Sequence, residues 1–177
     1  MLDGTRNFSG TWTNSALWTD DGTYKGLTVK KRTGQWQGLH KTLTTPIDQT
    51  VTFSAFVKAD GTGTSIVRIV FINGVENIEL RKVWNSAFDW TRDSITLNLK
   101  ANDVAYVRYE ISVVGTNSAL WVAGYKFEQG SIATPWLPSA SEVTPSDYPS
   151  YTGWYVGKIA DGQSLEPTKY NWEKILN

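Results

Sequence analysis

The sequence predicts an all-β protein, specifically a two-sheet antiparallel β-sandwich of the jelly-roll type. β-branched and aromatic residues alternate along much of the chain, Gly, Asn and Asp turn signals separate these runs, and no segment sustains apolar residues at helical spacing. Strand spacing of roughly 8 to 12 residues is typical of sandwiches. The expected strands are residues 26–31, 36–43, 50–58, 65–72, 76–84, 93–99, 105–114 and 119–128.

The connections between the later strands carry residues that accept a left-handed backbone. Asp60-Gly61-Thr62-Gly63 and Asn73-Gly74 supply the positive-φ positions that tight hairpins need. Thr116-Asn117 is expected to form another turn. These turns favour antiparallel pairing of neighbouring strands.

Alternation within a strand assigns its side chains to two faces. In 50–58 one face carries Val51, Phe53, Ala55 and Val57, and the other carries Thr52, Ser54, Phe56 and Lys58. In 105–114 the residues expected to point inward are Val107, Tyr109, Ile111 and Val113, which leaves Tyr106, Arg108, Glu110 and Ser112 outward. The outward row of 105–114 is polar and contains groups that suit contact with a sugar.

The composition changes after Trp136, where a Pro/Ser-rich stretch without periodicity indicates an extended linker. We therefore expect one domain over 1–138 and an extension over 139–177. The extension is too short for a core of its own, yet its Tyr and Trp residues are too many for a solvated tail. It is expected to pack on a neighbouring protein or on the sandwich.

Charge and cysteine content exclude several functional classes. Seventeen basic residues balance seventeen acidic ones, so no basic surface is expected for nucleic acid or an anionic membrane. The absence of cysteine removes disulfides, thiolate metal sites and cysteine nucleophiles. No run approaches the roughly 20 apolar residues that span a bilayer. The start of the chain shows no basic segment followed by an apolar stretch, so we expect no secretory leader, and it also fits a fragment of a longer polypeptide.

Catalytic constellations are weak in this sequence, and we expect no enzyme. The one histidine, His40, lies in an expected strand without a nucleophile elbow, so a plain sheet residue is favoured over a ligand contact. Glu76 and Glu79 are three residues apart in an expected strand, so they point to opposite faces and cannot flank one glycosidic bond. Glu110 could pair with another acid, but a surface ion pair with Arg108 is favoured.

A metal or cofactor site is not expected either. Asp20-Asp21-Gly22 resembles part of a calcium loop but lacks the spaced oxygen ligands and distal Glu of an EF-hand. A turn that closes a hairpin is the favoured interpretation. The chain also lacks a nucleotide-binding glycine pattern.

Aromatic residues point to binding. The chain has nine Trp, eight Tyr and six Phe, and we do not expect one core of this size to bury all of the Trp side chains. Some should be exposed, where aromatic side chains usually serve recognition. Aromatic faces stack on sugar rings while planar polar groups bond hydroxyls. Trp36 and Trp84 are the expected platforms, with a Trp that caps the core edge as the alternative for each. The expected polar contacts are Gln35, His40, Arg68, Arg81, Tyr106, Arg108 and Glu110.

One segment resembles a known family. Residues 120–136 contain Lys126-x-Glu128-x-Gly130-x-x-x-Thr134-x-Trp136, which is similar to the closing strand of jelly-roll carbohydrate-binding modules in tail and baseplate proteins of phages that infect Gram-positive bacteria. Leu2-Asp3-Gly4-Thr5, with Phe8 and Trp12, is similar to that family's opening strand, and 53–61 to its central strand and turn. The resemblance covers most of 1–138.

The resemblance implies a virion component that adheres to host cell-wall polysaccharide, as a module inserted into an enlarged distal tail protein. Host saccharide and other tail proteins are the partners it implies, and it carries no ligand motif onto particular residues. The alternative is a structural or assembly module whose exposed aromatics make protein contacts within a tail. A glycan-cleaving enzyme is a more distant alternative.

Overall fold

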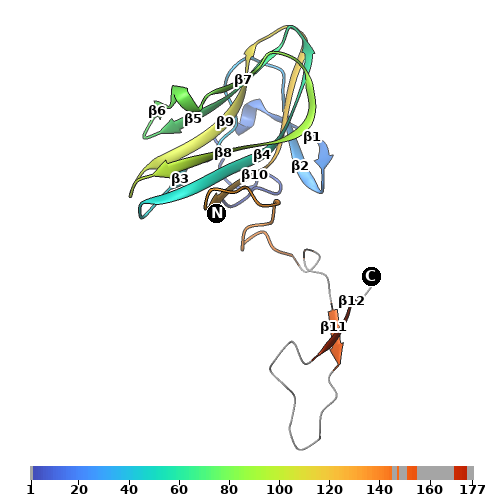
Figure 1. Cartoon of the computed structure of the whole chain (residues 1–177). Coiled ribbons are helices and arrows are strands. Elements are labelled where there is room, and N and C mark those ends of the chain that lie inside the picture. The colour runs from blue at the N-terminus through green and yellow to red at the C-terminus, as the bar shows by residue number, and fades with distance from the viewer. Residues whose placement is uncertain (1, 145–146, 148–150, 155–169, 175–177) are drawn as a thin grey trace, which may run out of the picture. The chain divides into compact units, whose positions relative to one another are not determined.

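The computed structural model describes residues 2–144, 147, 151–154 and 170–174, and it divides the chain into two compact units, Met1–Glu142 and Val143–Asn177. Met1–Glu142 is an antiparallel β-sandwich, so the predicted fold class is confirmed (Figure 1). Alternating apolar residues let each sheet bury one face against the other.

The first sheet has the strand order β1-β2-β10-β4-β8. The second has the order β3-β9-β5-β6, and β7 also pairs with β5. The strands of the first sheet are β1 (Thr19–Tyr24), β2 (Leu27–Arg32), β10 (Thr116–Gln129), β4 (Gln49–Thr62) and β8 (Phe88–Leu99). Those of the second are β3 (Leu43–Thr44), β9 (Val104–Val113), β5 (Ser65–Ile72), β6 (Val75–Glu76) and β7 (Lys82–Trp84). Two short 3-10 helices, η1 (Ser15–Leu17) and η2 (Ile78–Leu80), lie in the connections.

The core lies between the sheets and is rich in aromatic rings. Phe53 of β4 meets Tyr125 of β10 edge to face at 5.3 Å between centroids, and both are fully buried. The predicted alternation holds in β4, since Val51, Phe53, Ala55 and Val57 all join this core. It holds in β9 for Val107, Tyr109 and Ile111. Val113 is exposed instead, because it follows an irregularity in the β5–β9 register at the end of the strand.

Two strand predictions and two turn predictions need correction. Thr116 and Asn117, expected to form a turn, begin β10. Residues 36–42 do not form a strand, and Trp36 and Gln37 both have positive φ, which extended pairing does not allow. The expected strand 76–84 is broken by η2. Asp20-Asp21-Gly22 belongs to β1 and not to a hairpin turn; the turn is Lys25-Gly26. Nearly all of β1 is exposed, so no apolar alternation marked it as a strand.

The residues after Pro138 continue the first unit for a short distance. The Glu142 carboxylate accepts hydrogen bonds from the backbone N–H of Arg6 (2.6 Å) and the hydroxyl of Ser139 (2.7 Å). In the second unit, β11 (Tyr151–Trp154) pairs with β12 (Asn171–Lys174). The expected packing of 139–177 on a neighbour or on the sandwich stays a prediction, and its Tyr155 lies outside the described residues. Within the described ranges, no helix is long and apolar enough to cross a bilayer.

Candidate functional site

The outer face of the second sheet carries most of the residues expected to bind a ligand. Core residues alternate with outward ones along β9, which places Tyr106, Arg108 and Glu110 on this face. Each lies opposite an outward residue of β5: Tyr106 pairs with Phe71, Arg108 with Ile69 and Glu110 with Val67. The face therefore has an apolar row on β5 and a polar row on β9.

Three rings stack in a line across this face. His40 stacks on Tyr106 at 4.1 Å and Tyr106 stacks on Phe71 at 4.8 Å, with interplanar angles of 19° and 12°. The Arg108 guanidinium lies over the Phe71 ring at 4.9 Å. Packing of this kind fixes the rotamers of all four side chains, so Arg108 is presented in a defined position.

Glu110 of β9 anchors residues 35–38 to the sheet through Gly38. Its carboxylate accepts a hydrogen bond from the N–H of Gly38 at 2.8 Å and lies 3.0 Å from Nε of Arg108. Its second oxygen, Oε2, is buried and has no hydrogen-bond partner among the described residues. A side chain at position 38 would meet the Tyr109 carbonyl at 2.7 Å, so this close approach needs glycine. The expected ion pair between Arg108 and Glu110 is present, but Glu110 is buried, so the pair is not a surface one as expected.

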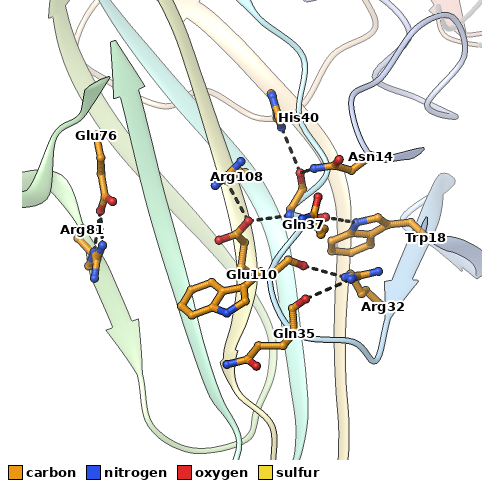
Figure 2. A network of polar contacts seen from close by, with 12 residues as sticks. Asn14, Trp18, Arg32, Gln35, Gln37, His40, Glu76, Arg81, Arg108 and Glu110 are labelled. Carbon is orange, nitrogen blue, oxygen red and sulfur yellow. Dashed lines mark hydrogen bonds and ion pairs between the residues drawn. The ribbon is translucent and has the colours of Figure 1, made fainter. Parts of the chain in front are cut away.

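The rim of the face is residues 35–38, which we call the rim segment. Side chains of Arg32, Trp18 and Asn14 satisfy its carbonyls (Figure 2). Arg32 donates to the carbonyls of Gln35 and Trp36 at 3.2 and 2.8 Å, the Trp18 indole donates to that of Gln37 at 3.0 Å, and Asn14 donates to that of Gly38 at 3.0 Å. A loop with every carbonyl bonded in this way is held in one conformation.

Trp36 is the exposed ring of the rim segment. Its side chain is 45% exposed, although its backbone N–H is tied to the Ile111 carbonyl of β9 at 3.0 Å. Trp36 and Gln37 have φ of 55° and 60°. Two successive non-glycine residues with positive φ are strained, and such strain persists only where surrounding contacts impose it. The fold thus holds the backbone of Trp36 in one conformation and leaves its large apolar ring partly exposed to water.

Burial sets the ionisation of His40. Nδ1 lies 3.1 Å from the Gly38 carbonyl, which can only accept, so Nδ1 carries the proton. Desolvation lowers the pKa of His40 below 6.5, and the Arg108 charge lowers it further. The imidazole is therefore neutral at pH 7.

Two of the nine expected site residues, Arg68 and Trp84, face the interior, and a third, Arg81, is tied up in an ion pair at the edge of the sheet. Arg68 points toward the inside of the sandwich, where its guanidinium pairs with Asp93 at 2.7 Å, because even-numbered residues of β5 face the core. Trp84 packs against the core beside Phe88, at 5.5 Å, which is the core-edge alternative stated for it. Arg81 bonds Glu76, and Figure 2 shows this pair apart from the Glu110 group.

The sequence interpretation missed the residues that support the site. Asn14, Trp18 and Arg32 lie outside the segments expected to bind, and Phe71 was not among the expected contacts. No local signal marks them, because their role depends on contacts between distant segments. Among the described residues, no group of three or more His, Cys, Asp and Glu could hold a metal ion.

Comparison with known proteins identifies no family for this chain. No protein-family model matches it, and no curated protein matches it. Among solved structures it is similar to the CBM22-1 xylan-binding domain from Paenibacillus barcinonensis Xyn10C, with a TM-score of 0.45 and 16% identity over 66% of this chain and 81% of that one.

Two further solved structures are similar. The tripod BppUct-A-L from the baseplate of bacteriophage Tuc2009 gives a TM-score of 0.40 and 22% identity over 82% of this chain and 62% of that one. The sugar-binding EclA C-terminal domain gives a TM-score of 0.43 and 15% identity over 64% of this chain and 84% of that one. With TM-scores below 0.5, these likenesses leave ligand and site open.

Proposed function

We propose that this chain is a non-catalytic carbohydrate-binding module and that it binds glycan on the outer face of the second sheet. The observation that carries the proposal is the exposed Trp36 ring, fixed in a strained backbone by hydrogen bonds to all four carbonyls of the rim segment. A rigid aromatic ring pays little conformational entropy on binding and offers a flat surface to the C–H face of a sugar.

Polar groups on the same sheet face complete the site. The Arg108 guanidinium, held over Phe71, presents N–H donors in a fixed plane, and neutral His40 retains Nε2 as an acceptor. Tyr106 lies between them, and its hydroxyl can both donate and accept. Glu110 positions Gly38 through a hydrogen bond and Arg108 through an ion pair. These are binding and positioning roles, and none of them requires a reacting group.

The biological setting we propose is a phage tail or baseplate protein that adheres to host cell-wall polysaccharide. The resemblance of the segment 120–136 to tail and baseplate modules supports this setting. An open sheet face makes few contacts per sugar, so one copy should bind weakly. Several copies in a tail would raise avidity by roughly 10² to 10⁴ through effective concentration.

A second function, assembly within the tail, is favoured by one observation. Val75, Ile78 and Val83 are 71%, 72% and 48% exposed around β6 and β7, at the border of the second sheet. Exposed apolar groups at a sheet border suit a protein partner. Under this alternative, replacing Ile78 and Val83 by Ser would abolish association with a neighbouring tail protein, and Trp36→Ala would not affect cell adhesion.

The deciding experiment measures adhesion of a multivalent fluorescent fusion to whole Gram-positive cells, with soluble wall polysaccharide as competitor. We expect labelling that the polysaccharide removes, loss of labelling in Trp36→Ala, and partial recovery in Trp36→Phe. Trp154→Ala is the matched control, since Trp154 of β11 is 51% exposed and belongs to the second unit. Absence of labelling on every host tested, or equal loss in the Trp154 control, would overturn the proposal.

A further inference from the structure

The outer face of the first sheet carries a second aromatic cluster, separate from the core. Its buried residues are Leu27, Val29, Phe56 and Ala123, and its partly buried ones are Tyr24, Trp90, Trp121 and Trp136. These residues come from β1, β2, β4, β8, β10 and the segment after β10. Since one side of this sheet already covers the core, a sandwich does not need a second apolar layer on its solvent side.

Part of this cluster is held by the motif that carries the family resemblance. The Lys126 ammonium donates to the Glu128 carboxylate at 2.9 Å and to the Pro135 carbonyl at 3.0 Å, and the Thr134 N–H donates to Glu128 at 2.8 Å. These bonds fold the segment after β10 back onto the sheet and bring Trp136 over it. A Cβ at Gly124 would lie 2.6 Å from Leu27 and 3.3 Å from Trp136, so glycine makes room for this packing.

Beneath Trp136 lies a pocket of about 390 Å³, lined by Lys25, Leu27, Phe56, Arg92, Pro135 and Trp136. This volume is in the range of small-molecule sites. Its lining includes two cations and no carboxylate. Neither Lys25 nor Arg92 has an ion pair to a carboxylate in the part of the chain that the structure describes.

Both cations are held at the same ring. The Lys25 ammonium lies 5.1 Å from the centroid of Phe56 and the Arg92 guanidinium lies 5.6 Å from it. Arg92 also donates to the Ser54 hydroxyl at 2.9 Å and to the Thr134 carbonyl. Glu128, the acid whose charge acts on Arg92, is already bonded to Lys126 and Thr134. Two cations near one ring, neither of them in an ion pair with a carboxylate of the described residues, complement an anion.

We propose that this pocket binds an anionic saccharide, with the acidic group between Lys25 and Arg92 and the sugar ring against Trp136. Aromatic walls suit a sugar ring, and the two cations favour a unit that carries a carboxylate or a phosphate over a neutral one. Nucleic acid does not fit the charge pattern, because the chain has no net positive charge to follow a phosphate backbone. This second site lies on the opposite side of the sandwich from the proposed glycan face and does not depend on it.

The test titrates the full chain, labelled with ¹⁵N, with methyl β-glucuronide, glucose 6-phosphate and, as a neutral comparison, methyl β-glucoside. We expect at least one acidic probe to shift the indole N–H signal of Trp136, assigned with Trp136→Phe, and the glucoside at the same concentration to leave it unchanged. Which acid binds distinguishes a carboxylate ligand from a phosphate ligand. Affinity should fall as salt is raised.

Two variants and one control complete the test. Arg92→Gln and Lys25→Asn should each weaken binding about tenfold, the loss of one charge-assisted contact. Asn tolerates the left-handed backbone of position 25, where φ is 52°, so this variant keeps the test valid if Arg92→Gln fails to fold. Lys100→Gln is the control, since Lys100 is exposed and pairs with Asp48 elsewhere.

The proposal is overturned if neither acid shifts the Trp136 signal, if the glucoside shifts it equally, or if Lys100→Gln weakens binding as much as the pocket variants. The result is separable from the proposed function. Trp36→Ala should remove cell adhesion and leave the acid-induced shift of Trp136 intact. Lys25→Asn should weaken the acid-induced shift and leave adhesion intact where the wall glycan is neutral.

Discussion

The indole N–H of Trp18 donates a hydrogen bond to the backbone carbonyl of Gln37 at 3.0 Å. Trp18 is 4% exposed and belongs to the core, whereas Gln37 lies on the exposed rim with a φ of 60°. The bond therefore transmits the rigidity of the core to the strained rim segment that carries Trp36.

Trp18→Phe removes this hydrogen bond and keeps an aromatic ring in the core. We expect a loss of about 1 kcal/mol in the free energy of unfolding from one buried hydrogen bond, together with a fall in glycan adhesion as the rim loosens. Urea unfolding and the cell-labelling assay measure the two effects. Trp12→Phe is the control, because Trp12 donates a similar bond to the Ser9 carbonyl at 3.0 Å away from the rim. Equal adhesion in the two variants would refute the role of Trp18.

Arg32→Lys tests whether the fork of donors matters more than the charge. Arg32 bonds three carbonyls, those of Leu17, Gln35 and Trp36, and an ammonium cannot reach all three with a planar geometry. Adhesion should fall about tenfold, as expected for one or two lost charged bonds, while the cation is retained. Lys82→Arg changes a cation elsewhere in the sandwich and should leave adhesion unchanged.

Gly38→Ala should displace the rim segment from β9. The added Cβ would lie 2.7 Å from the Tyr109 carbonyl and 2.8 Å from Glu110 Cγ. Overpacking of this kind costs about 1–3 kcal/mol, which chemical unfolding would detect. A Gly38→Ala protein with native stability and adhesion would contradict the close approach.

His40 should make stability depend on pH in a narrow window. Its folded pKa is lowered below the unfolded value of 6.5, mainly by burial, so the unfolded state binds the proton more readily. The stabilisation is complete above pH 6.5 and declines as the pH falls from 6.5 toward the folded pKa. Urea unfolding between pH 7.5 and 5.5 measures this slope, and His40→Gln should flatten it. An unchanged slope in that variant would assign the effect to other groups.

Asp93 should prove to be a stability residue of the interior. Its carboxylate accepts bonds from Arg68 at 2.7 Å, the Tyr109 hydroxyl at 2.9 Å and Lys82 at 2.8 Å. Asp93→Ala leaves the buried Arg68 unpaired and should cost about 3–5 kcal/mol of unfolding free energy. Asp89→Ala, which breaks an exposed pair with Lys58, should change stability little. Calorimetry would compare the two, and similar losses would argue against the buried charge as the cause.

The alternation pattern was enough to predict the fold class and the faces of the long strands. Alternation has a fixed period of two in any strand, so it separated Val51, Phe53, Ala55 and Val57 from Phe56, and Tyr109 from Arg108, without knowledge of the partners. The expected outward row of β9 is part of the candidate site for this reason. The placement of Trp36 as exposed and Trp84 as core-edge remained open, because both alternatives fit the same pattern.

Features that depend on pairing between distant segments could be read only from the folded chain. Arg68 faces inward because the β5 register sets its parity, and its charge is tolerated there because Asp93 of β8 lies opposite. Residues 36–42 leave extended geometry because Arg32, Trp18 and Glu110 fix Trp36 and Gln37 in a left-handed backbone. The pocket under Trp136 joins Lys25 of the β1–β2 turn to Arg92 of β8. Local preference specifies which face a side chain takes, and long-range contacts specify what that face meets.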